Sequence, residues 1–121
     1  MTSEQRQEAL VRVSIIMLTE AIYDYSLDKE DDDYKTLNLL YSLRSLFYAI
    51  DSIKNVIWTE NVVQDNRYLC ELFVPYHLCN GKASKIAISF DGMDRSGYMI
   101  GTVSLTVDGE EVLNGIRYVK I

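Results

Sequence analysis

The chain is poor in residues that break or cross-link a fold. It has one proline, six glycines, two cysteines and one histidine in 121 residues. So few breakers exclude a long linker or a disordered, low-complexity chain. Two cysteines give no disulfide framework, which predicts a reducing, cytoplasmic compartment. No apolar run approaches the roughly 18 residues of a membrane span, and the polar residues 1–8 predict no secretory signal.

The residues that usually carry catalysis or bind metal are equally sparse. Cys70, His77 and Cys79 include no close cysteine pair and no second histidine, so a zinc site lacks ligands and a thiol nucleophile lacks an oriented base. An EF-hand frame that starts at Asp28 would need glycine where Asp33 stands and glutamate where Leu39 stands. The loop from Gly92 onward lacks the lysine of a phosphate loop. The sequence therefore predicts no cofactor, no metal and no catalytic residue.

An excess of acidic residues is the chain's most unusual feature, and this excess is concentrated in one stretch. Seven of its 18 acidic residues fall between positions 20 and 33, with only Lys29 as a cation, so this stretch carries the whole chain's net charge of −6. The acids are Glu20, Asp24, Asp28, Glu30, Asp31, Asp32 and Asp33. Concentrated negative charge attracts a basic surface at a distance and repels nucleic acid. A basic protein surface is therefore the expected partner.

Two helices are predicted in the first half of the chain. Apolar residues recur every three or four positions from about Glu4 to Ser26, with Ser3 as the expected start, and again from about Asp32 to Asn55. The short connection at 27–31 predicts an antiparallel helical hairpin. Aspartates at 31–33 would also suit a helix start for stability alone, so a merely solvated turn is the alternative explanation for the acids there.

From Val56 onward the apolar period changes to two, which predicts antiparallel strands. The expected strands cover residues 68–76, 86–90, 99–107 and 111–121, with a further strand at 57–63. Pro75 indicates a sheet edge or a strand end because it has no N–H to donate. The expected turns are Asn80–Gly81 and Asp108–Gly109, with a loop at 91–97 and a β-bulge at Asn114–Gly115.

Helices that precede strands define the α+β class. We predict a single domain over 1–121, in which a helical hairpin (1–55) packs on one face of a four- to five-stranded antiparallel β-meander (56–121). Thr102, Ser104 and Thr106 alternate with apolar residues, so the other sheet face should be at least partly wet.

Nine tyrosines are the second unusual feature. Tyr34, Tyr41 and Tyr48 are seven residues apart, so they should share one face of the second helix. Tyrosine is a common interface anchor, although a broad core face with hydroxyls reaching water is an equally good explanation. We therefore predict a partner-binding surface that consists of the seven acids together with Tyr34 and Tyr41.

These features favour a small, non-catalytic binding protein that covers a basic surface of a partner, for example a nucleic-acid-binding groove. The profile resembles that of phage inhibitors of host defence and of toxin-immunity proteins, which are also short, acidic and free of motifs. One alternative is a small-ligand or enzymatic pocket with Tyr76, His77 and Asp91 as polar lining. Another is a homo-oligomer, such as a homodimer, joined through an exposed strand or through Tyr34 and Tyr48.

Overall fold

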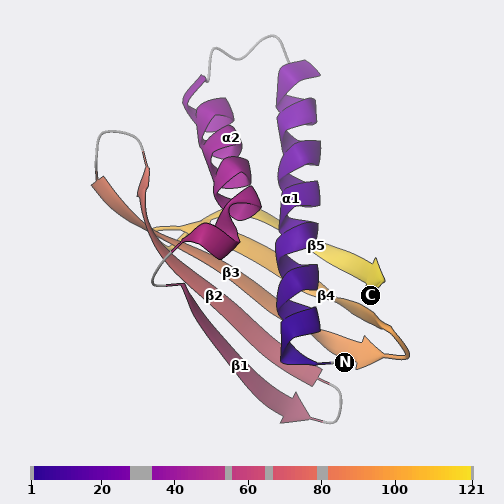
Figure 1. The fold of residues 1–121 in the computed structure, drawn as a ribbon. Coiled ribbons are helices and arrows are strands. Elements are labelled where there is room, and N and C mark those ends of the chain that lie inside the picture. Colours follow the sequence, from indigo (N-terminus) through magenta and orange to yellow (C-terminus); the bar gives the residue numbers. More distant parts are fainter. Residues whose placement is uncertain (1, 28–33, 54–55, 65–66, 79–81, 121) are drawn as a thin grey trace.

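The computed structural model describes residues 2–27, 34–53, 56–64, 67–78 and 82–120. The predicted class is confirmed: two helices pack on one face of a five-stranded antiparallel sheet (Figure 1). The sheet order follows the chain, as in a meander. The elements are α1 (Ser3–Leu27), α2 (Tyr34–Tyr48), the 3₁₀ turn η1 (Ile50–Ser52), β1 (Ile57–Gln64), β2 (Arg67–Leu78), β3 (Lys82–Arg95), β4 (Tyr98–Val107) and β5 (Glu110–Lys120).

Helix α1 begins at the expected Ser3 and is preceded by a capping box. The Thr2 hydroxyl accepts a hydrogen bond from the Gln5 backbone N–H at 3.2 Å, and the Thr2 backbone N–H donates to Gln5 Oε1 at 2.9 Å. These two bonds satisfy donors that a helix start leaves free. They fix the entry of the chain into α1, which begins at Ser3 as expected, with Thr2 as its capping residue.

Helix α2 is shorter than its apolar pattern suggested. It ends at Tyr48, and the chain continues through η1 to Ile53, which is extended, so the predicted helix up to Asn55 is wrong beyond Tyr48. The chain has to descend here from the helix layer to the sheet. The predicted acidic connection between the helices lies outside the described residues.

The core lies between the helices and one face of the sheet. Its fully buried side chains include Leu10 and Leu18 of α1, Leu43 and Phe47 of α2, and alternate residues of the strands. The strand residues are Cys70, Leu72, Val74, Ile86, Ile88, Phe90, Met99, Val103 and Leu105. This alternation is the period of two that the sequence shows.

The opposite sheet face has no helix over it in the described part of the chain (Figure 1). Thr102 is exposed there as predicted, together with the apolar side chains of Ile100 and Ile116. Pro75 lies beyond Phe73, the last residue of β2 that pairs with β1, so its position at a free edge also agrees with the prediction.

Two turn predictions need correction. Residues 91–95 belong to β3, and only Ser96–Gly97 turns the chain, with φ of 42° and 86°. Asp108–Gly109 turns it again as predicted, with φ of 52° and 85°. The Asn114–Gly115 pair lies in regular register in β5. The irregularity falls earlier, where Leu105 opposes Leu113 and Thr106 opposes Glu111.

Candidate functional site

The predicted surface at the tip of the helical hairpin is partly visible in the structure. Glu20 and Asp24 are exposed on the last turns of α1, which extend past the strands in Figure 1. Tyr41 of α2 is 44% exposed, and the Arg44 guanidinium lies 5.2 Å from the centre of its ring. Asp28, Glu30, Asp31, Asp32 and Asp33 lie outside the described residues, and so does the side chain of Tyr34.

Glu20 is less available than the sequence suggested. Its Oε2 accepts a hydrogen bond from Arg117 Nη2 of β5 at 2.8 Å, so this ion pair ties the last turns of α1 to the edge of the sheet. Asp24 has no ion-pair partner among the described side chains, and it lies between two exposed tyrosines, Tyr23 and Tyr25. Asp24 is therefore the described acid that best fits a binding role at the tip.

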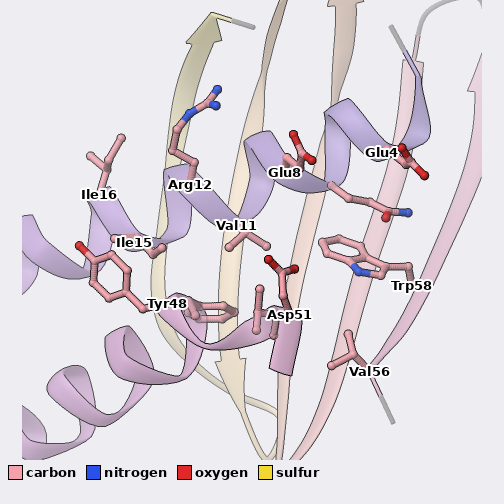
Figure 2. Close-up of a pocket in the computed structure, with 13 residues that line it drawn as sticks. Glu4, Glu8, Val11, Arg12, Ile15, Ile16, Tyr48, Asp51, Val56 and Trp58 are labelled. Carbon is pink, nitrogen blue, oxygen red and sulfur yellow. The ribbon is translucent and has the colours of Figure 1, made fainter. Parts of the chain in front are cut away.

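A second surface, which the sequence did not reveal, is a groove beside the N-terminal half of α1. It encloses about 650 Å³ and is called the α1 groove below. One wall is the α1 stripe from Glu4 to Ile16 (Figure 2). The other wall consists of Phe47, Tyr48, Ile50 and Asp51. Val56 and Trp58 contribute from the start of the sheet. The groove exists because α2 stops at Tyr48 while the N-terminal half of α1 continues over the sheet.

The α1 groove has an apolar floor and an acidic rim. Val11, Ile15 and Trp58 are only partly buried and pack against the core, so they offer apolar surface to a ligand. The carboxylates of Glu4, Glu8 and Asp51 lie at the rim, and none of them has an ion-pair partner within the described residues. Apolar surface that ends in a few charged groups is typical of a binding site.

Arg12, the only basic residue in the described lining of the groove, does not neutralise this rim. Arg12 Nη2 donates a hydrogen bond to the backbone carbonyl of Lys120 at 3.0 Å, so the guanidinium is held toward β5. Figure 2 shows Arg12 pointing away from the groove, whereas Asp51 and Trp58 point toward Val11. The described lining of the α1 groove is therefore acidic.

A buried ionic cluster fixes the geometry of this region. Arg6 of α1 forms an ion pair through Nε with Glu60 of β1, and its Nη1 donates a hydrogen bond to Asp94 Oδ2 of β3 at 2.8 Å. The Tyr68 ring lies 4.0 Å from the guanidinium. Burial alone would lower the pKa of Arg6, but Asp94 and Glu60 outweigh it and raise that pKa. The cluster holds α1 and β1, which both line the groove, in a fixed relation.

The residues of the alternative pocket prediction do not come together in the described part. Asp91 lies on the open sheet face, opposite the helices, and accepts two hydrogen bonds of 3.1 Å from Arg67. The Arg67 hydrogen bonds lower the pKa of Asp91. The side chains of Tyr76 and His77 lie outside the described residues. Asp91 therefore has a partner already and faces away from the α1 groove.

Cys70 is buried in the core, as the structural interpretation predicted; Cys79 lies outside the described residues. Desolvation raises the pKa of the Cys70 thiol to about 11. A thiol with such a pKa is almost entirely protonated at neutral pH and is a poor nucleophile. Over the described ranges, no group of three or more His, Cys, Asp or Glu side chains could hold a metal ion.

Comparison of the chain with protein-family models, with curated proteins and with solved structures gives no match. Neither α1 nor α2 is both long enough and apolar enough to cross a membrane. The functional inference therefore rests on the chemistry of the two surfaces described above.

Proposed function

We propose that the protein is a non-catalytic binding protein that covers a basic surface of a partner protein. The observation that carries the proposal is the negative charge of the exposed side chains of α1. Its exposed charged residues are the acids Glu4, Glu8, Glu20 and Asp24 and the single base Arg12. Glu20 and Asp24 lie one helical turn apart on the same side of α1 near the hairpin tip, whereas Glu4 and Glu8 lie on another side near its start. The acids at the tip are therefore the ones that this proposal assigns to a basic surface.

The partner on this proposal is a cytoplasmic protein with a basic groove, such as one that binds nucleic acid. Carboxylates along a helix would occupy the positions of phosphates there, so the protein would act as an inhibitor of the anti-defence or immunity type. Exposed charge mainly raises the association rate and its salt dependence, whereas buried aromatic side chains supply affinity. Asp24 would steer the encounter, and the neighbouring Tyr23 and Tyr25 would supply contact area.

The proposal is tested by charge reversal at the hairpin tip. The variant Asp24→Lys/Asp28→Lys should fold normally and lose the partner, because two attractions become repulsions. Glu20 stays unchanged because its reversal would place a lysine against Arg117. The matched control is Glu110→Lys/Glu111→Lys, since these exposed acids start β5 and give the same change in net charge.

The measurement uses each variant as bait and quantifies the proteins that it retains from an extract of the native cell at about 50 and 500 mM salt. Exposed charge interactions are strong at the lower salt concentration and largely screened at the higher one. We expect a basic protein that the wild type and the control retain at low salt and that the tip variant loses. Equal retention by all three proteins would reject the hairpin tip as the site. A partner that is bound independently of salt would reject the electrostatic mechanism.

A further inference from the structure

The α1 groove is lined along a length that a short helix could follow. The α1 residues that line it are at positions 4, 7, 8, 11, 12, 15 and 16, which is the spacing of a helix–helix contact. Between Glu4 and Ile16 this stripe is about 18 Å long at 1.5 Å per residue. That length accommodates three turns of a helix, of which the inner face would occupy the groove. Since α2 ends at Tyr48, no described helix of this chain fills the space.

The floor of the groove provides anchor positions for apolar side chains. Val11 and Ile15 lie one helical turn apart on α1, and Trp58 lies across from them on β1 (Figure 2). All three are partly buried and backed by the core, so their positions are fixed before a ligand arrives. A preformed apolar floor of this kind receives the i, i+3 or i+4 side chains of an amphipathic helix.

The rim defines the charge of the occupant. Glu4, Glu8 and Asp51 have no ion-pair partner within the part of the chain that the structure describes, and Arg12 is held by the Lys120 carbonyl. A helix with acidic flanks would be repelled, whereas lysine or arginine beside its apolar stripe would pair with the rim. We propose that the α1 groove binds a basic amphipathic helix of a partner protein, with the apolar stripe on Val11, Ile15 and Trp58.

A second copy of this chain is a poor occupant of the groove. A two-fold contact places the same patch on both sides, so the acids of one rim would face the acids of the other. The chain's net charge of −6 adds a general repulsion between copies. The inference shares with the proposed function the requirement for a basic partner, but its site is separate from Asp24 and the hairpin tip.

The chain's single tryptophan makes the groove directly observable, because Trp58 lines it. The probe is a synthetic amphipathic helical peptide of about four turns, built from leucine and lysine. One comparison peptide has glutamate in place of lysine, and another has the same composition in a scrambled order. We expect only the basic amphipathic peptide to shift Trp58 emission to the blue and to protect Trp58 from acrylamide quenching. The helix content of the protein itself should stay the same with and without peptide.

Variants then separate the groove from unspecific attraction. Glu8→Lys/Asp51→Lys should weaken peptide binding, measured by calorimetry, by about tenfold or more, since two rim pairs become repulsions. Glu110→Lys/Glu111→Lys has the same net charge and should bind as the wild type does. Trp58→Phe keeps an aromatic side chain in the groove, so its affinity for the peptide should be close to that of the wild type. This result would show that Trp58 reports binding but is not itself required for it.

The possible results are decisive in both directions. Absence of peptide binding, binding that leaves Trp58 emission unchanged, or equal weakening in both charge-reversal variants would overturn the inference. Preference for a small cationic amphiphile such as dodecyltrimethylammonium over the peptide would also overturn it, in favour of a small-ligand pocket. Loss of a native partner on Asp24→Lys/Asp28→Lys would still support the proposed function, because that measurement does not involve the groove.

Discussion

Replacement of Arg6 should expose how much the fold depends on one buried cation. The side chains of Arg6, Glu60 and Asp94 are only 8%, 14% and 11% exposed, so the substitution Arg6→Met would leave two carboxylates with little access to water. Removal of one partner from a buried ion pair typically costs about 3–5 kcal/mol. Some residual exposure favours the lower end, so we expect a loss of about 3 kcal/mol in the free energy of unfolding.

Such a loss is easy to measure in a domain of this size. About 3 kcal/mol corresponds to a decrease in Tm on the order of 12 °C, and urea unfolding followed by circular dichroism should show a midpoint lowered by about 2 M. Methionine retains much of the volume of the arginine stem, so the measured change reports mainly charge. Because α1 and β1 both line the groove, Trp58 emission should also shift toward that of solvent-exposed tryptophan.

A charge-free cluster is the control for this prediction. The triple variant Arg6→Met/Glu60→Gln/Asp94→Asn removes both carboxylates together with the cation, and it should recover most of the lost stability. A loss below about 1 kcal/mol in the single variant would contradict the described cluster, since exposed ion pairs have values of that order. A triple variant no more stable than Arg6→Met would show that lost packing, and not uncompensated charge, causes the effect.

Two further predictions concern the sheet. Gly101→Ala should destabilise the protein by about 1–3 kcal/mol, because the added Cβ would lie 2.7 Å from the Phe90 ring and closer still to backbone atoms. Gly115→Ala is the control and should be tolerated, because its Cβ would have no contact below 3.8 Å. Thermal unfolding compares the two variants, and equal stability would contradict the predicted difference. In a Cys79→Ser background, Cys70 should resist alkylation at pH 8 until the protein unfolds, and rapid labelling of the folded protein would contradict its burial. The free energy of unfolding should fall as pH rises from about 9 to about 11, because the thiol ionises first in the unfolded chain while its folded pKa is about 11. A Cys70→Ala variant should lack this part of the pH dependence.

The architecture was accessible from periodicity alone, since the two apolar periods mark where helices give way to strands. Residues 91–95 were predicted to be a loop because aspartates and a glycine suit turns. In the structure three of these residues have a long-range reason to be in a strand. Asp94 meets Arg6, 88 positions away, and Asp91 meets Arg67. Gly92 lies opposite Gly101, where a side chain would collide with the Phe90 ring. Local composition does not contain such partners.

The two candidate surfaces also differ in how far the sequence predicts them. The acids of the hairpin tip are adjacent in the chain, so a count of charges finds them, although it does not find the Arg117 partner of Glu20. The α1 groove assembles residues from α1, α2, η1 and β1, and it depends on where α2 ends. The apolar pattern continues through Ile50 and Ile53 and conceals that end. A groove that results from the premature end of a helix has no local sequence signal.

The order of the strands has a consequence for biosynthesis. Each hairpin of the meander can close soon after its second strand is made, but α1 rests on β4 and β5, and its Arg12 bonds to Lys120, the hundred-and-eighth residue further on. At about 5–20 residues per second, the ribosome needs between five and twenty seconds to supply that surface. During this interval the apolar stripe of the nascent helix has only α2 to cover it. Chaperones should therefore bind the first 25 residues, and crosslinks between these residues and chaperones should persist until the last strand emerges.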